Sequence, residues 1–345
     1  HDTKRGEDVR ARINVISEIP REWRERVRVW HRLNRGKKTP VHGVPAPDKN
    51  DEYLLYQTLL GAWPMTMAAD DDETFAERIQ AYMHKALREA KTHVSWINPS
   101  PEYDQAVQSF IATLLDRSRP NEFLDDFRPF QARVAELGIY NSLAQNVLRL
   151  CAPGVPELYQ GAELWELHLV DPDNRRPVDF GRRQALLADL RRRIEEAGTD
   201  LGPLARTLLD QRHDGRIKLY VIHRGLAYRR EHPRLFQRGD YVPLDASGTR
   251  STHLCAFARS HDAEEVVVVV PRLLSRLCGG DAPVGPAVWG DDAVLLPPGE
   301  ESRTYRDLLT GEIVGSVERE GRRTLPLAAV FSILPVAMLE RIKGS

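Results

Sequence analysis

The chain has 345 residues, of which 29% are charged and 41% are hydrophobic, an ordinary composition for a globular protein long enough to form two domains. Its formal net charge of -1 gives no reason to expect a nucleic acid or an anionic membrane as a partner. The longest apolar run, residues 325–339, is interrupted by prolines and is too short to span a bilayer.

The cysteines indicate the cellular compartment, and the first residue indicates whether the chain is part of a longer protein. Cys151, Cys255 and Cys278 are odd in number and lack the spacing of a metal site. We therefore expect a reducing, cytoplasmic compartment, no disulfide framework, and no bound metal or cofactor. The chain begins with histidine, and its first methionine is Met65, so we expect it to be part of a longer polypeptide.

The first part of the chain has the apolar periodicity of helices. Between residues 7 and 33 the apolar residues recur at helical spacing and are interrupted at Pro20, which predicts two helices. After a connection rich in Gly, Pro and Lys, residues 51–60 begin another helix. Tyr56 and Trp63 can offer stacking surfaces to a sugar, but aromatic residues on a helical stripe more often belong to the core.

Two further helices are separated by a loop that carries Trp96 and Asn98. The first helix has an apolar stripe that begins at Phe75, and the second begins at the Ser-Pro pair of residues 100–101, which suits an N-cap and a first turn. Loops often carry binding residues, so the two loop residues are candidates for binding. Residues 10–125 are thus predicted to be all-helical.

The middle of the chain leads into a long segment without regular periodicity. Residues 127–137 and 140–150 read as helices, and residues 155–160 suit a short buried strand. The following residues, 160–180, are dense in groups that bind polyols, and a loop after a strand is where a barrel places its chemistry. Alternatively, DPDN at 171–174 is a plain turn whose side chains bond their own backbone. Residue types alone leave both readings open.

The last part of the chain changes from helical to strand periodicity. Residues 182–197 predict a charged amphipathic helix, and residues 201–209 predict another. Beyond them, short segments rich in Val, Leu and aromatic residues alternate with Gly, Pro and Asp turns, which is typical of an antiparallel sandwich. The predicted strands are 218–223, 254–258, 265–270, 293–296, 303–307, 323–327 and 330–334.

Four stretches point to one family. They are HDTKRGEDVRARI at 1–13, EYLLYQTLLGAWP at 52–64, AYMHKALREAKTHVSWINPSPEYDQAV at 81–107, and PGVPELYQGAEL with DPDNRRPVDF between 153 and 180. Together they resemble the C-terminal portion of the maltooligosyltrehalose synthase family, within the alpha-amylase superfamily (glycoside hydrolase family 13). This resemblance implies the C-terminal part of a (β/α)8 TIM barrel with an all-helical insertion, followed by an antiparallel β-sandwich.

The resemblance also implies domain boundaries. Residues 1–9 would form the end of the seventh barrel strand with a catalytic loop, and residues 10–125 the helical insertion. Residues 126–213 would be the last helix and strand unit of the barrel, with a substrate loop at 160–180. Residues 214–345 would form the sandwich.

Roles for single residues follow from the same resemblance. Asp2 corresponds to the carboxylate that stabilises the transition state, and His1 to a residue that orients the sugar. No metal ligand is expected. The other expected substrate-binding residues are Lys4, Arg5, Tyr159, Gln160, Asp171, Asp173, Asn174, Arg175 and Arg176.

The implied reaction converts the reducing-end alpha-1,4 bond of a maltooligosaccharide into an alpha,alpha-1,1 bond by intramolecular transglucosylation, an isomerase reaction of trehalose biosynthesis. Retaining chemistry of this kind needs a nucleophile and a general acid. In the superfamily both precede the His-Asp pair in sequence, so we expect them outside this chain. We expect the chain alone to be inactive and to need the N-terminal half of the barrel as well as the maltooligosaccharide substrate.

Two alternatives remain at this stage. One is an alpha-1,4-glucan hydrolase of the same superfamily, against which the stretches at 52–64 and 171–180 argue. The other is a non-catalytic fragment that binds carbohydrate or serves as a scaffold.

Overall fold

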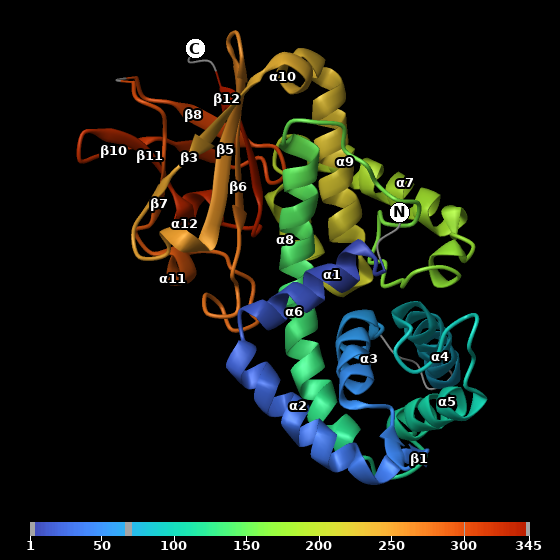
Figure 1. The fold of residues 1–345 in the computed structure, drawn as a ribbon. Helices are drawn as coiled ribbons and strands as arrows, with labels where there is room; N and C mark the ends of the chain where they lie inside the picture. Colours follow the sequence, from blue (N-terminus) through green and yellow to red (C-terminus); the bar gives the residue numbers. More distant parts are fainter. Residues whose placement is uncertain (1–3, 66–70, 300, 343–345) are drawn as a thin grey trace. The chain divides into compact units, whose positions relative to one another are not determined.

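The computed structural model describes residues 4–65, 71–299 and 301–342, and for residues 71–73 it describes the backbone alone (Figure 1). The predicted catalytic residue Asp2 and the predicted sugar ligand His1 therefore lie outside the described residues. The chain divides into two compact units. The first comprises residues up to 138 together with 167–176, and the second comprises residues 139–166 together with those from 177 onward.

The first unit is helical, as the periodicity predicts. Pro20 is the first residue of its helix, where its missing N–H costs nothing, and the Ser100 hydroxyl accepts a hydrogen bond from the Tyr103 N–H at 3.4 Å. The predicted connection after the second helix contains a short hairpin. The elements are α1 (Glu7–Asn14), α2 (Pro20–Asn34), β1 (Thr39–Val41), β2 (Val44–Ala46), α3 (Lys49–Ala62), α4 (Asp71–Ala90), α5 (Pro101–Leu115), most of α6 (Glu122–Cys151), and the 3-10 segments Val15–Ser17, Arg35–Lys37 and Asp173–Arg175.

Aromatic side chains form the core of the helical unit. Trp30 is fully buried, and its ring centroid lies 5.3 Å from the rings of both Tyr56 and Phe127. Trp63 is also buried and lies 5.2 Å from the Phe127 ring. The expectation that Tyr56 and Trp63 belong to the core is confirmed, so neither presents a ring face to solvent for a sugar.

Helix α6 is one helix of 30 residues where the sequence predicts two segments. Gly138 lies at the predicted break and allows α1 to approach, because a Cβ there would stand 2.5 Å from Arg12 Cγ. The buried Arg12 guanidinium donates to the carbonyls of Gly61, at 3.1 Å, and Trp63, at 2.5 Å. It therefore satisfies acceptors at the C-terminal end of α3, and its burial lowers the Arg12 pKa to about 10.

The second unit combines helices with two antiparallel sheets. The six-stranded sheet has the order β3-β5-β6-β12-β8-β9, and the four-stranded sheet has the order β10-β11-β7-β4. The helices are α7 (Phe180–Ala197), α8 (Gly202–Asp210), α9 (Arg216–Glu231), α10 (Pro233–Arg238), α11 (Pro286–Trp289) and α12 (Leu327–Val330). The strands are β3 (Asp240–Leu244), β4 (Ala246–Ser247), β5 (Leu254–His261), β6 (Glu264–Pro271), β7 (Ala293–Leu295), β8 (Thr304–Asp307), β9 (Ile313–Gly315), β10 (Val317–Arg319), β11 (Arg322–Pro326) and β12 (Ala337–Ile342).

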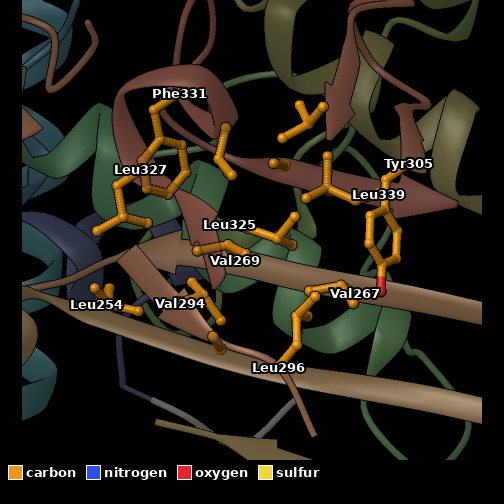
Figure 2. Close-up of a cluster of buried hydrophobic side chains, with 14 of the residues drawn as sticks. Leu254, Val267, Val269, Val294, Leu296, Tyr305, Leu325, Leu327, Phe331 and Leu339 are labelled. Carbon is orange, nitrogen blue, oxygen red and sulfur yellow. The ribbon is translucent and has the colours of Figure 1, made fainter. Parts of the chain in front are cut away.

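Side chains from both sheets share one hydrophobic core. Val267, Val269 and Leu339 come from the larger sheet, and Val294 and Leu325 come from the smaller one (Figure 2). This arrangement confirms two packed antiparallel sheets, and the predicted strands near 254, 265, 293, 303 and 323 are present.

Two strand predictions in the second unit are wrong. Residues 155–160 form no strand, since Pro156 lacks an N–H donor, Val155 is 94% exposed, and no described strand pairs with them. Residues 218–223 belong to helix α9, whose buried face continues to Tyr228. A short apolar run does not distinguish a strand from a buried helix.

The C-terminal strand prediction is also wrong. Residues 330–334 form the end of α12 and a turn, and the final strand is β12. Its sequence, AMLERI, is rich in helix formers, but β6 and β8 pair with it on both sides. Tertiary pairing therefore overrides local propensity at this position.

Candidate functional site

The candidate site is the segment 167–176, which we call the binding loop, together with the first described residues of the chain. Arg5 forms an antiparallel bridge with Leu169, flanked by backbone hydrogen bonds from Gly6 N to the His168 carbonyl at 2.9 Å and from Val170 N to the Lys4 carbonyl at 3.0 Å. A Cβ at Gly6 would lie 3.1 Å from the His168 ring. The backbone therefore places Lys4 and Arg5 beside the binding loop within one unit.

Arg78 of helix α4 anchors the binding loop through Asp173. Its Nε and Nη2 donate to the two carboxylate oxygens of Asp173, each at 3.0 Å, and Nη2 also donates to the Leu167 carbonyl at 2.9 Å. Asp173 also accepts a hydrogen bond from the Leu169 N–H at 2.8 Å, and its side chain is only 8% exposed. The Asp173 carboxylate thus holds the loop in shape through partners on both sides.

Lys85, two turns further along α4, holds the neighbouring carboxylate. Its ammonium donates to Asp171 Oδ1 at 2.5 Å and to the Asp171 carbonyl at 3.1 Å. Glu89, on the next turn, pairs with Lys4. Helix α4 therefore presents two cations to the loop and one carboxylate to the N-terminal segment.

The electrostatic balance keeps both loop carboxylates ionised. Burial, the largest influence on Asp173, raises its pKa, but the bonds from Arg78 and the Leu169 N–H outweigh burial and hold the pKa below its ordinary value. The hydrogen bond from Lys85 lowers the pKa of Asp171. A general acid near neutral pH needs a raised carboxyl pKa, so neither group suits that role.

The solvent-facing part of the loop is rich in hydrogen-bond donors. Arg175 is 73% exposed and pairs with Asp171 at 3.1 Å, while Arg176 is half exposed and pairs with Asp173 at 2.5 Å. Asn174 precedes them in the 3-10 turn Asp173–Arg175. Charge-assisted donors of this kind can hold the oxygen atoms of a polyol.

Tyr159 and Gln160, the other two predicted ligands, belong to the second unit. Gln160 is exposed at the start of a turn, and the Tyr159 carbonyl accepts a hydrogen bond from the Ala162 N–H at 3.0 Å. The structure therefore brings together Lys4, Arg5 and the residues of the binding loop. Tyr159 and Gln160 lie in the other unit, and their positions relative to the loop are not described.

No family model matches the sequence. A putative maltooligosyl trehalose synthase of Mycobacterium tuberculosis is 33% identical over 344 residues, which is 99% of this chain and 37% of that protein. The solved maltooligosyltrehalose synthase of Arthrobacter ramosus is 31% identical, with a TM-score of 0.73 over 98% of this chain and 37% of that one.

Over almost its whole length, this chain is similar to maltooligosyltrehalose synthases. A hypothetical synthase of Sulfolobus tokodaii agrees, with 31% identity and a TM-score of 0.67 over 99% of this chain and 38% of its own. The chain thus spans about 37% of the length of the curated synthases that it matches. The predicted resemblance is confirmed, and the partial coverage agrees with the expectation that the chain corresponds to one portion of a synthase.

The partners of the binding loop, Arg78 and Lys85, were not identified from the sequence. Arg78 and Lys85 lie on α4 beside the predicted apolar stripe, at a spacing of seven residues that places them on one face of the helix. That spacing is a signal for a polar contact along the edge of a buried face, but it does not reveal which carboxylates the two cations bind.

Among the described residues, no helix has the length and apolar character needed to cross a membrane.

Proposed function

We propose that this chain is the C-terminal portion of a maltooligosyltrehalose synthase. In this proposal the complete protein converts the reducing-end alpha-1,4 bond of a maltooligosaccharide into an alpha,alpha-1,1 bond. The observation that carries the proposal is similarity to putative and solved synthases over 98–99% of the chain. The finer expectations belong to the proposal as well: the partial TIM barrel, the helical insertion at 10–125, the boundaries near 126 and 214, and a cytoplasmic location.

Within this function the binding loop holds the glucose that is freed when the alpha-1,4 bond breaks. The intermediate must be kept from bulk water while the freed glucose turns, which requires several simultaneous contacts. Lys4, Arg175 and Arg176 carry exposed charged donors suited to sugar oxygens. Asp171 and Asp173 are engaged by Lys85 and Arg78, so they act chiefly by positioning these donors.

The remaining assignments rest on the family resemblance. Asp2 stabilises the transition state, His1 orients the sugar, and Arg5, Tyr159, Gln160 and Asn174 contact the substrate. The nucleophile and the general acid come from the N-terminal half of the barrel, so this chain alone is inactive. A missing N-terminal half is accordingly its proposed protein partner.

The loop assignment is tested in a complete synthase that carries this chain, by measuring the ratio of isomerisation to hydrolysis of maltohexaose. Arg176→Gln removes a donor from the grip, so we expect free glucose to escape and hydrolysis to rise about tenfold relative to isomerisation. Arg182→Gln is the matched control, because Arg182 is exposed outside the loop. An unchanged ratio in Arg176→Gln would remove the loop from the proposal.

The second candidate is a carbohydrate-binding module without its own chemistry. It is favoured by the low pKa values of Asp171 and Asp173, since neither carboxylate is suited to proton transfer near neutral pH. Calorimetric titration of the chain with maltohexaose distinguishes it from a scaffold. Saturable binding that weakens in Arg176→Gln supports a binding module, and no heat of binding supports a scaffold role.

A further inference from the structure

The helical unit contains a second site with its own chemistry. A cavity of about 510 Å³ lies against helices α2 and α3, and its lining includes Arg28, Lys49, Asn50, Glu52, Tyr53 and Tyr56. None of these residues belongs to the binding loop or contacts it in the interactions described above. The cavity therefore needs an explanation separate from the proposed sugar transfer.

The aromatic wall of the cavity is held in place before any ligand binds. The Tyr53 hydroxyl accepts a hydrogen bond from Trp23 Nε1 at 3.0 Å, and the two rings lie 5.9 Å apart. The Tyr56 hydroxyl donates to Glu52 at 2.6 Å and accepts from Asn34 Nδ2 at 2.9 Å. Tyr53 is 37% exposed, so its ring offers a preformed apolar surface to a ring of similar size.

The one carboxylate that lines the cavity is already in use. The Glu52 carboxylate is almost fully buried and takes hydrogen bonds from Lys38 Nζ at 2.8 Å, from His31 Nδ1 at 2.6 Å, and from the Tyr56 hydroxyl. Three of its roughly four lone-pair positions are therefore occupied. It has little capacity left to accept a hydrogen bond from a ligand hydroxyl.

The two cationic side chains at the rim of the cavity, in contrast, remain available for a ligand. Arg28 and Lys49 are exposed, and no carboxylate among the described residues forms an ion pair with either one. The first amides of α3 do not add to the site, since Asp48 Oδ1 accepts from Asn50 N and Asp51 N. The cationic character of the rim thus comes from the two side chains rather than from the helix terminus.

This imbalance identifies the class of ligand. A neutral sugar carries no charge that the two rim cations could neutralise, so it would gain less from them than an anion would. The phosphate of a monoester is mainly a dianion near neutral pH and then only accepts hydrogen bonds, and Arg and Lys side chains commonly hold it. The cavity has free cationic donors, an exposed ring, and a carboxylate that is already filled.

We propose that this cavity binds a small phosphate monoester with a ring body, such as a sugar phosphate. The phosphate lies between Arg28 and Lys49, and the ring lies against Tyr53. The site would give the protein a means of sensing phosphorylated sugars that is independent of the binding loop, and it does not rest on the proposed synthase activity.

Isothermal titration of the 345-residue chain tests the proposal with glucose 6-phosphate, glucose and inorganic phosphate as probes. We expect saturable binding of glucose 6-phosphate with a Kd of about 1 mM or below, and binding of glucose at least about tenfold weaker. Arg28→Gln and Lys49→Gln should each weaken glucose 6-phosphate about five- to tenfold. Tyr53→Ala should weaken glucose 6-phosphate and leave inorganic phosphate unchanged.

Arg24→Gln is the matched control, since Arg24 is exposed one turn earlier on α2 and does not line the cavity. All the charge variants alter exposed residues, so circular dichroism should show an unchanged fold. The proposal is overturned if glucose binds as tightly as its phosphate, or if Arg24→Gln weakens binding as much as Arg28→Gln. Absence of saturable binding up to about 10 mM would overturn it too.

Discussion

Replacing Arg78 with methionine should loosen the binding loop while the rest of the helical unit stays folded. The change removes two hydrogen bonds to Asp173 and one to the Leu167 carbonyl. Truncating one partner of a buried ion pair costs about 3–5 kcal/mol. Asp173 keeps the Leu169 N–H and the exposed Arg176, so we expect the lower cost of about 2 kcal/mol that is typical of lost hydrogen bonds to a charged group.

Native-state hydrogen exchange at the Leu169 amide, which donates to Asp173, measures this loosening directly. A local cost of about 2 kcal/mol corresponds to roughly 30-fold faster exchange. Arg32→Met serves as control, since Arg32 is exposed on α2. Adding Asp173→Asn to Arg78→Met should recover part of the loss, because the unpaired buried charge is then gone. Exchange that accelerates less than about threefold in Arg78→Met would refute the anchoring role.

Three further predictions concern other parts of the structure. Burial raises the Asp307 pKa to about 6, so the folded state holds this proton more tightly than the unfolded chain does. The free energy of unfolding should therefore fall by at most about 3 kcal/mol as the pH rises from 4 to 6. In urea titrations, Asp307→Asn should lack this pH dependence. Gly138→Ala should destabilise by about 1–3 kcal/mol because its Cβ would meet the buried Arg12 side chain, whereas Gly36→Ala, with open space around it, should be neutral by thermal melting. Arg259→Met should lower the unfolding free energy by about 3 kcal/mol, since its guanidinium binds five backbone carbonyls; a loss no larger than that of an exposed arginine would contradict this.

Local signals explain why the helical elements could be predicted. Pro20 and Ser100 mark helix starts through their own backbone geometry and hydrogen bonds, which depend on residues a few positions away. Strands depend on partners distant in sequence. Residues 155–160 have the composition of a strand but no described partner, whereas β12 has the composition of a helix and two partners.

In the binding loop too, contacts with residues distant in sequence could not be predicted. The sequence left a turn and a polyol site open at 171–174, and the structure contains the turn, while the polyol site stays a prediction. Residues Asp173–Arg175 form a 3-10 turn, yet the acids are held by Arg78 and Lys85, which lie 95 and 86 residues earlier. Composition could therefore indicate a polar site, but it could not separate the positioning carboxylates from the exposed donors.

The central proposal is that this chain supplies the binding loop of a maltooligosyltrehalose synthase but not its nucleophile and general acid. The most direct test incubates the chain with maltohexaose, alone and together with the N-terminal portion of a related synthase, and follows reducing ends at constant sugar mass. The account predicts no change for the chain alone and a loss of reducing ends when both parts are present. A loss of reducing ends with the chain alone would contradict it, and so would a gain with both parts, which indicates hydrolysis.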